Sequence, residues 1–389
     1  MELSVNRIFT HLEQQLPAMK ATLRELVECE SPSDDPAAIA RFVELFAART
    51  SADGLAECRV IAGRNGFGPH LQCEFRLPAP KKRKAGQILG LGHSDTVWPM
   101  GTLARMPWRE ADGRLWGPGV LDMKAGLLFF VYAMRALRDL DIPVARKVML
   151  QIVSDEEVGS HTSRALTERE ARKSAAVLVL EPGTGLTGKL KTARKGVGGF
   201  TVKVTGKASH AGVDFAAGAS AIDELAWQIE RIRTFTNLER GITVNTGVIS
   251  GGTRSNVVAA EAQAQVDFRI PRLRDWPVLE RKFAALRPRD KRCTVMLTGE
   301  LNRPPMERTR EIAALFRTAQ QLAKACGGVK LEESSTGGGS DGNFTAALGI
   351  PTLDGLGAVG EGAHAPHESI LADRMADRAA VLAGLVASV

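Results

Sequence analysis

Three short and almost wholly apolar segments constrain the fold of this chain more than any other feature of its sequence. They span Gln87–Gly92, Val148–Val153 and Ala176–Leu180, and the intervening segment Leu121–Leu140 has the length and apolar content of a buried helix. Short apolar runs that end at glycine or at polar residues are typical of strands with both faces covered. We therefore expect an α/β domain in which helices cover both faces of a mixed, mostly parallel sheet.

The sequence pattern changes after residue 191. Phe200–Val204 and Ala262–Ile270 alternate apolar and polar residues, which is typical of antiparallel strands with one exposed face. Between them we expect a helix over about 217–235 and a strand over Ile242–Ile249. We interpret this region as a separate α+β domain inserted into the first. The expected bounds are 1–191 and 303–389 for the two parts of the first domain and 192–302 for the insertion.

The charge of the chain is basic but dispersed. It has 51 basic and 44 acidic residues among 389, which gives a formal net charge of +7. We interpret the one dense basic run, Lys81–Lys84, as the solvated tip of a hairpin, with a phosphate-binding or localisation patch as the alternative. Aromatic residues make up 5% of the chain and include one tyrosine, too few for stacking on single strands. We expect no nucleic-acid partner.

Cysteine usage and hydropathy indicate the compartment in which such a chain works. Five cysteines are scattered without CxxC spacing, and we expect them to be reduced thiols. The first residues do not show the basic and then apolar segment of a signal peptide. The longest strongly apolar run, Ala125–Ala133, has about half the length that spans a bilayer. We expect a cytoplasmic protein with no membrane partner.

Residues that can bind a metal ion occur in five loops, most of them directly after a predicted buried strand. Open α/β sheets place their functional sites there, beyond the carboxyl ends of the strands. The candidates are His93 with Asp95, Asp122, the run Asp155–Glu157, Glu181, and His364 with His367 nearby.

Each of these motifs also has a purely structural interpretation when it is taken alone. His93 and Asp95 can be a structural pair at a strand end, and Asp122 can be the N-cap of the following helix. The run Asp155–Glu157 can be a solvated acidic turn, although three successive carboxylates repel one another unless a cation holds them. The other two motifs can lie in ordinary surface loops. In a metal site, one carboxylate of the acidic run can bind metal while its neighbour acts as a base.

Taken in order, the motifs resemble those of the di-zinc aminoacylase/carboxypeptidase family, which includes glutamate carboxypeptidase, acetylornithine deacetylase and succinyl-diaminopimelate desuccinylase. The residues that carry the resemblance are His93-Ser-Asp95-Thr-Val, Gly119-x-x-Asp122-Met-Lys-x-Gly, Asp155-Glu156-Glu157-x-Gly-Ser, Glu181-Pro and Gly-Ala-His364. The similarity covers essentially the whole chain, including Ala208-Ser209-His210-Ala211-Gly212 in the predicted insertion. It implies a zinc-exopeptidase type of fold whose inserted domain is a lid and dimerisation domain, and hence a homodimer.

The resemblance also implies a role for each residue that matches a family motif. The implied ligands are His93 and Glu181 for one metal ion, Glu157 and His364 for the other, and Asp122 as the bridge between them. Asp95 would orient His93, and Glu156 would serve as the general base and then as the general acid. His210 would stabilise the oxyanion, in many members that of the partner subunit.

Three further positions concern the substrate and an alternative ligand. Asn256 and Arg269 match positions that meet the substrate in the carboxypeptidase branch. The alternative for Arg269 is a solvent-facing strand residue that balances Asp267. His367 is a second imidazole three residues after His364, where many relatives have a small or polar residue. The Gly-Ala-His spacing favours His364 as the ligand.

The implied ligands and motifs lead to an expected activity. Two imidazoles and three carboxylates suit two Zn²⁺ ions per chain, with Co²⁺ or Mn²⁺ able to substitute. Members with Glu at the position of Glu181 are usually carboxypeptidases and deacylases. The resemblance therefore implies a metal-dependent amidohydrolase for a small-molecule or peptide amide that bears a carboxylate. We favour a glutamate-carboxypeptidase-like activity, with an N-acyl amino acid deacylase of the acetylornithine or succinyl-diaminopimelate type as the alternative and a non-catalytic metal-binding relative as the remote one.

Overall fold

The structure is a computed structural model that describes residues 2–326 and 329–389. Contacts among these residues divide the chain into two compact units. The first contains the residues up to Ala193, Arg308–Ser335 and Ser340–Val389, and the second contains Arg194–Glu307 and Thr336–Gly339. The main part of the second unit therefore starts at 194 rather than at the expected 192 and ends at 307 rather than at 302.

The segment Thr336–Gly339 is the part of this division that the sequence did not indicate. The carbonyl oxygens of Gly338 and Gly339 accept hydrogen bonds from Arg194 Nη1, at 3.1 and 3.0 Å. These bonds join the segment to the second unit through its main chain. A run of glycines carries no apolar periodicity, so the pattern of side chains could not assign it.

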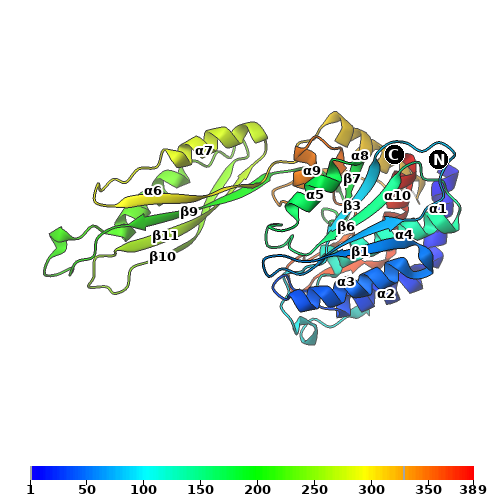
Figure 1. Ribbon diagram of the computed structural model, residues 1–389, viewed down its shortest axis with the longest axis horizontal. Helices are drawn as coiled ribbons and strands as arrows, with labels where there is room; N and C mark the ends of the chain where they lie inside the picture. The colour runs from blue at the N-terminus through cyan, green and yellow to red at the C-terminus, as the bar shows by residue number, and fades with distance from the viewer. Residues whose placement is uncertain (1, 327–328) are drawn as a thin grey trace. The chain divides into compact units, whose positions relative to one another are not determined.

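The main sheet of the first unit is mixed and mostly parallel, as the sequence predicts. Its strands, in spatial order, are β1 (Ala56–Ile61), β2 (His70–Phe75), β6 (Lys147–Val153), β3 (Gln87–His93), β7 (Ser174–Val179) and β14 (Thr352–Leu353). The pairs β6/β3, β3/β7 and β7/β14 are parallel, whereas β2 is antiparallel to both β1 and β6. Figure 1 labels β1, β6, β3 and β7, which follow one another across the sheet in this order.

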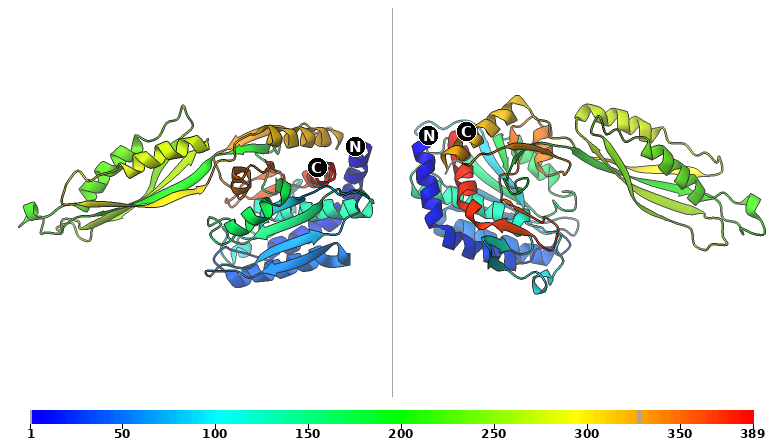
Figure 2. Two further views of the ribbon diagram at one scale, coloured as in Figure 1. Left: turned by 45° about the horizontal axis from the view of Figure 1, so that its top comes forward. Right: turned by 180° about the vertical axis from the view of Figure 1, so that it is seen from behind.

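Both faces of the central strands are covered, which explains their continuous apolar sequences. Ile88 of β3 and Leu150 of β6 belong to the large apolar cluster that includes α4 (Ala125–Asp139) and α10 (Met375–Ser388). Leu89, on the other face of β3, belongs to a separate cluster with Ala171 of α5 (Arg164–Ala171). Helices accordingly lie on both sides of the sheet in Figures 1 and 2.

The remaining elements of the chain surround this sheet or connect to it. The other helices of the first unit are α1 (Glu2–Gln14), α2 (Leu16–Glu28), α3 (Pro36–Ser51), α8 (Arg310–Ala325) and α9 (Gly342–Ala347). A small sheet has the order β15 (Gly360–Glu361), β16 (Ser369–Leu371), β5 (Arg114–Trp116) and β4 (Arg109–Ala111), and β13 (Glu333–Thr336) pairs with β8 (Leu190–Arg194). Single helical turns are η1 (Ala52–Gly54), η2 (Thr102–Ala104), η3 (Val120–Lys124), η4 (Phe215–Ala217), η5 (Leu273–Asp275) and η6 (Ala372–Arg374).

The second unit is an antiparallel sheet with helices on one face (Figure 1). Its strands, in spatial order, are β10 (Thr243–Gly251), β11 (Glu261–Ile270), β9 (Gly196–Thr205) and β12 (Thr294–Arg303), and its helices are α6 (Ala221–Arg233) and α7 (Trp276–Ala284). Exposed and buried residues alternate along β11, and the buried residue Phe268 packs in one cluster with Leu225 of α6 and Phe283 of α7. The period-two pattern of the sequence thus produces this one-sided sheet.

Two local predictions were wrong. The helix expected from Leu121 begins only at Ala125, because Asp122 and Met123 in the η3 turn have non-helical backbone angles. Lys81–Lys84 is not a hairpin tip, because β6 lies between β2 and β3, so the segment is a crossover loop. Its four side chains are exposed.

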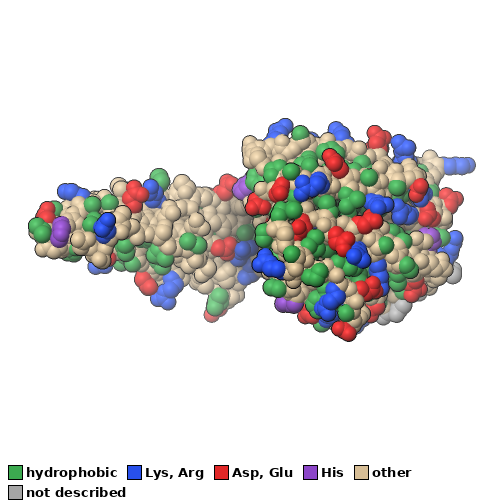
Figure 3. All heavy atoms as spheres, turned by 90° about the horizontal axis from the view of Figure 1, so that it is seen from below, with side chains coloured by type: hydrophobic (Ala, Val, Ile, Leu, Met, Phe, Trp, Pro, Cys, Tyr) green, Lys and Arg blue, Asp and Glu red, His purple; other side chains and the backbone are tan. Residues whose placement is uncertain are grey.

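Figure 3 shows basic and acidic side chains interspersed over one face, in agreement with a dispersed charge.

The described helices give no sign of a membrane span. None of the helices within residues 2–326 and 329–389 combines the length and the apolar character needed to cross a bilayer.

Gly126 sets how closely α4 approaches the strand end that leads to Glu181. A Cβ atom at this position would lie 2.0 Å from the carbonyl oxygen of Leu180 and 3.2 Å from Cα of Gly357. Because both neighbours are backbone, Gly126→Ala should destabilise the fold by about 1–3 kcal/mol in urea denaturation, the usual range for overpacking. Gly337→Ala is the control, because nothing lies within 4 Å of its added Cβ. Equal stability of the two variants would contradict the prediction.

Candidate metal centre

His93 is the last residue of β3 and presents one ring nitrogen to two carboxylates. Its Nδ1 lies 2.9 Å from the carbonyl oxygen of Asp95. Because a carbonyl oxygen can only accept, Nδ1 carries the hydrogen, and in the neutral ring the lone pair is then on Nε2. Nε2 lies 3.3 Å from Asp122 Oδ1 and 3.5 Å from Glu181 Oε1. The buried ring is therefore held in the tautomer that can bind a metal through Nε2.

Asp122 faces two imidazoles with its two oxygens. Oδ1 lies 3.3 Å from His93 Nε2, and Oδ2 lies 3.4 Å from His364 Nε2. The same nitrogen of His364 lies 3.2 Å from Glu157 Oε1. One carboxylate thus lies between two imidazoles from distant parts of the chain, each of which has a further carboxylate beside it. This is the arrangement that a bridging ligand needs.

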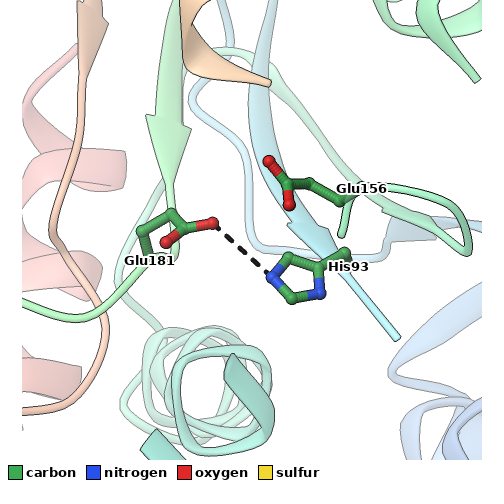
Figure 4. Close-up of side chains that lie close together, drawn as sticks. All are labelled: His93, Glu156 and Glu181. Carbon is green, nitrogen blue, oxygen red and sulfur yellow. Dashed lines mark ion pairs between the residues drawn. The ribbon is translucent and has the colours of Figure 1, made fainter. Parts of the chain in front are cut away.

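The other acidic side chains of the cluster follow the carboxyl ends of the two parallel strands that flank β3. Glu156 and Glu157 follow β6, and Glu181 follows β7. One ligand atom from each of His93, Glu156 and Glu181 lies within 4.8 Å of the others, and His93, Asp122 and Glu157 form a second such group. Figure 4 shows His93, Glu156 and Glu181 converging from three separate segments. The sheet topology therefore brings together residues that are up to 88 positions apart (181 − 93).

Asp95 is fully buried and connects His93 to the acidic loop. Its Oδ2 accepts hydrogen bonds from Ser33 Oγ at 2.9 Å and from the main-chain N–H of Glu157 at 3.1 Å. Its Oδ1 accepts from the main-chain N–H of Glu156 at 3.3 Å and lies 3.5 Å from His93 Nδ1. One buried carboxylate thus fixes both the imidazole and the backbone that carries the two glutamates.

The electrostatics of the cluster favour a cation between these side chains. Burial raises the pKa of Glu157 above its ordinary value. Burial acts on Asp122 in the same direction, but its hydrogen bonds with His364 and His93 hold its pKa well below the ordinary value. The hydrogen bonds of His364 to Asp122 and Glu157 raise its pKa from 6.5 to about 10. Protons on the imidazoles neutralise the carboxylates here, and a divalent ion can replace them.

His364 rather than His367 is the imidazole that joins this cluster. His364 contacts Asp122 and Glu157, while His367 is exposed and makes no hydrogen bond or ion pair with any described residue. The structure places the five predicted metal ligands together with Asp95 and Glu156 in the first unit.

His210 and Asn256 belong to the second unit, where their loops lie side by side. The main-chain N–H of Ala211 donates to the carbonyl of Asn256 at 2.9 Å. His210 is exposed, and its Nδ1 accepts from the main-chain N–H groups of Gly212 and Val213, at 3.1 and 3.2 Å. The neutral ring therefore carries its hydrogen on Nε2, which makes Nε2 a donor.

Arg269 also belongs to the second unit and pairs with its strand neighbour Asp267. Its Nε and Nη2 donate to the two carboxylate oxygens of Asp267, both at 2.9 Å. This is the alternative that the sequence offered for Arg269. A substrate carboxylate would have to compete with Asp267 for the guanidinium group.

Sequence reasoning missed two residues that hold the centre from outside. Ser33 donates to Asp95, and Glu368 accepts from the backbone of the turn that carries Asp122. Neither residue is among the candidates that the sequence offers. The only available signal was a polar residue beside a ligand motif. Such a signal does not reveal a hydrogen bond between residues that lie 62 or 246 positions apart in the sequence.

The comparison with known families decides what kind of protein carries this cluster. Residues 90–388 match the model of the peptidase family M20/M25/M40. The chain belongs to this family. Members of the family are metal-dependent amidohydrolases, and so is this chain.

Individual relatives within the family differ in their reactions. The chain is 28% identical to carboxypeptidase G2 of Pseudomonas sp. (strain RS-16) over 363 residues, which cover 92% of this chain and 86% of that protein. It is 30% identical to acetylornithine deacetylase of Klebsiella pneumoniae (strain 342) over 216 residues, or 52% and 55% of the two chains. Its fold matches the crystal structure of Bacillus subtilis YXEP, a dinuclear metal-binding peptidase of the M20 family, with a TM-score of 0.68, 13% identity and coverage of 96% and 98%.

The raised pKa of His364 predicts how pH affects the metal-free protein. Between pH 6.5 and about 10, the folded chain holds a proton that the unfolded chain has released. Stability therefore falls as the pH rises through this window. We expect the melting temperature of chelator-treated protein to fall over this range, and to fall less in the His364→Asn variant. His367→Asn is the matched control and should keep the slope of the parent. If the melting temperature of His364→Asn falls with pH as steeply as that of the parent, the pH dependence does not come from His364.

Proposed function

We propose that this chain binds two divalent metal ions and hydrolyses an amide bond in a glutamate-carboxypeptidase-like reaction. One observation carries the proposal. The two oxygens of Asp122 lie 3.3 and 3.4 Å from Nε2 atoms of two different imidazoles. Each imidazole also lies beside a second carboxylate, at 3.5 Å for Glu181 and 3.2 Å for Glu157.

The donor set supports two ions that share one carboxylate. In this proposal His93 and Glu181 hold one ion, His364 and Glu157 hold the other, and Asp122 bridges them. All donors are imidazole nitrogens or carboxylate oxygens, which suit Zn²⁺, with Co²⁺ or Mn²⁺ as substitutes. When bound, such ions lower the pKa of water and polarise a substrate carbonyl.

The side chains around the ligands would move the protons of the reaction. Glu156 accepts a proton from the attacking water and then donates it to the amide nitrogen as the C–N bond breaks. General acid–base catalysis of this kind is worth roughly 10²–10⁴-fold in rate. Asp95 fixes the main chain of Glu156, so the base keeps its place relative to His93. His210 would donate from Nε2 to the oxyanion, and Asn256 and Arg269 would bind substrate.

The relatives favour a carboxypeptidase-like substrate over an N-acyl amino acid. The similarity to carboxypeptidase G2 extends over 92% of this chain, whereas the similarity to acetylornithine deacetylase extends over 52%. We therefore propose an amide whose leaving group is a C-terminal acidic residue. The deacylase is the second candidate, because both reactions need the same metal centre and differ only in the substrate pocket.

A substrate panel and one variant test this proposal. We expect the zinc-loaded protein to release glutamate from acyl-glutamates faster than it releases amine from N-acetylornithine or succinyl-diaminopimelate. Glu156→Gln should lower kcat by about 100-fold or more, because the amide cannot accept the proton from water. Its metal content, measured by atomic emission, should equal that of the parent.

The control for this test is Glu74→Gln, which changes a carboxylate on β2 that pairs with Lys147. It should keep the activity of the parent. Activity of Glu156→Gln within about tenfold of the parent would refute the role of Glu156 as base. Two bound metal ions without turnover on the whole panel would identify a non-catalytic relative instead.

We also propose that the second unit forms a homodimer through β10. This strand lies at an edge of its sheet, and Val248 and Ile249 are 54% and 59% exposed. An apolar edge strand with unpaired main-chain groups is a surface that a second copy can cover.

Light scattering after size exclusion tests the dimer. The parent should have the mass of two chains, and Ile249→Lys should have the mass of one, because a charge would be buried at the interface. Met296→Lys is the matched control, since Met296 is 56% exposed on β12 at the opposite edge of the same sheet. It should remain a dimer. A monomeric parent, or a monomer formed only by Met296→Lys, would refute the assignment to β10.

A further inference from the structure

The loop Gly362–Glu368 carries His364 and Glu368, and these two side chains have different surroundings. His364 points to Asp122 Oδ2, at 3.4 Å, and to Glu157. Glu368, four residues later, is 1% exposed and directly precedes β16. Neither the metal ligands nor the proposed proton transfer involves Glu368. A buried carboxylate with no metal assigned to it needs another explanation.

Four N–H groups surround the carboxylate of Glu368. Oε1 accepts from the main-chain N–H groups of Leu121 at 2.8 Å and Asp122 at 3.0 Å. Oε2 accepts from the main-chain N–H of Gly119 at 2.9 Å and from Trp98 Nε1 at 2.8 Å. Three of the four donors belong to one short stretch of backbone, the turn that carries Asp122.

This turn satisfies only some of its own donors. Gly119 has a φ of +71°, and Asp122 has a φ of −117° and a ψ of 93°, so the regular α-helix begins only at Ala125. Within the turn, the N–H of Lys124 reaches the carbonyl of Gly119 at 3.0 Å. The N–H groups of Gly119, Leu121 and Asp122 are instead directed to Glu368. An external acceptor with several lone pairs is therefore part of this backbone geometry.

We propose that Glu368 is a positioning residue that fixes Asp122 so that its two oxygens face the two imidazoles. The hydrogen bond from the main-chain N–H of Asp122 fixes the backbone from which that side chain extends. The bonds from the neighbouring residues fix the direction of the turn. Because Glu368 and His364 share one loop, the same contact also aligns His364 with Asp122. This inference rests on the proposed metal centre and assigns a role within it.

Only a carboxylate meets the geometry of this site. An ionised carboxylate is purely an acceptor and offers about four lone-pair positions for four donors. A glutamine side chain has one oxygen and would direct its NH₂ group at two N–H donors. Glu368→Asp keeps the charge and both oxygens but shortens the side chain by one methylene. It should therefore retain part of what Glu368→Gln loses.

Metal binding is the first test. We expect Glu368→Gln to bind Co²⁺ with roughly 10–100-fold lower affinity at one or both sites, the usual effect of losing a residue that orients a ligand. The visible absorption spectrum of the Co²⁺ protein should change, because the ligand field at Asp122 changes. With substrate, kcat should fall while KM stays close to the parent value. Glu368→Asp should lie between the parent and Glu368→Gln.

Hydrogen exchange of the metal-free protein is the second test and does not depend on any metal. The amides of residues 119–122 should exchange at least about tenfold faster in Glu368→Gln, because their acceptor is lost. The control is Glu361→Gln, since Glu361 is half-exposed in the neighbouring strand β15 and pairs with Arg114 at 2.8 Å. Trp98→Phe removes one donor and leaves the three main-chain bonds, so it should resemble the parent.

The outcomes separate this inference from the proposed function. Parent-like Co²⁺ affinity, spectrum and exchange in Glu368→Gln would overturn the positioning role. A parent that binds no metal would refute the metal centre, while the exchange data would still decide whether Glu368 holds the turn. Should Glu368→Gln fail to fold, Glu368→Asp with a parent-like melting temperature provides the same comparison. An unchanged spectrum and unchanged exchange in that variant would count against the proposal.

Discussion

The position of one carboxylate between two imidazoles is the constraint on which the rest of the first unit depends. Asp122 cannot face His93 and His364 together unless the end of β3 and a loop near the C-terminus meet at the start of α4. The parallel sheet provides that meeting place, because its neighbouring strands end at the same edge. Its apolar faces are covered by helices, and the loops that follow its edge carry the candidate ligands.

Negative charge is concentrated at this edge, and the structure stabilises it in two ways. Asp95 and Glu368 are buried, and each accepts hydrogen bonds from the main chain of a segment that carries candidate ligands. Asp122, Glu157 and Glu181 lie beside imidazoles, which can hold a proton or share a cation. Buried charges that would be costly alone are therefore tolerated, because these five carboxylates have a donor or an imidazole beside them. The same property makes the site ready for divalent ions.

The sequence predicted those parts of the molecule that repeat a simple pattern. Continuous apolar runs indicated β3, β6 and β7, because strands covered on both faces need apolar residues at every position. Alternation indicated β11, because one face of that strand is exposed. The candidate ligands could be found because they follow the predicted strands directly. The family motifs then supplied their order.

Long-range contacts could not be predicted in this way. The pairing of β2 with β6 made Lys81–Lys84 a crossover, although the local sequence suggested a hairpin. A single glutamate such as Glu368 carries no periodic signal that would reveal a bond to residues 246 positions away. The bidentate pairing of Arg269 with Asp267 was the exception, because residues two apart on a strand share a face and the sequence alone suggests the pair.

The order of the candidate ligands along the chain has a consequence for biosynthesis. His93, Asp122, Glu157 and Glu181 are translated before the second unit begins at Arg194, and His364 is translated after Glu307. A nascent chain therefore exposes a partial site while the ribosome adds 183 more residues (364 − 181). Until the last segment folds back, the acidic edge lacks one of its two imidazoles. A product that terminates before His364 therefore cannot assemble the whole centre.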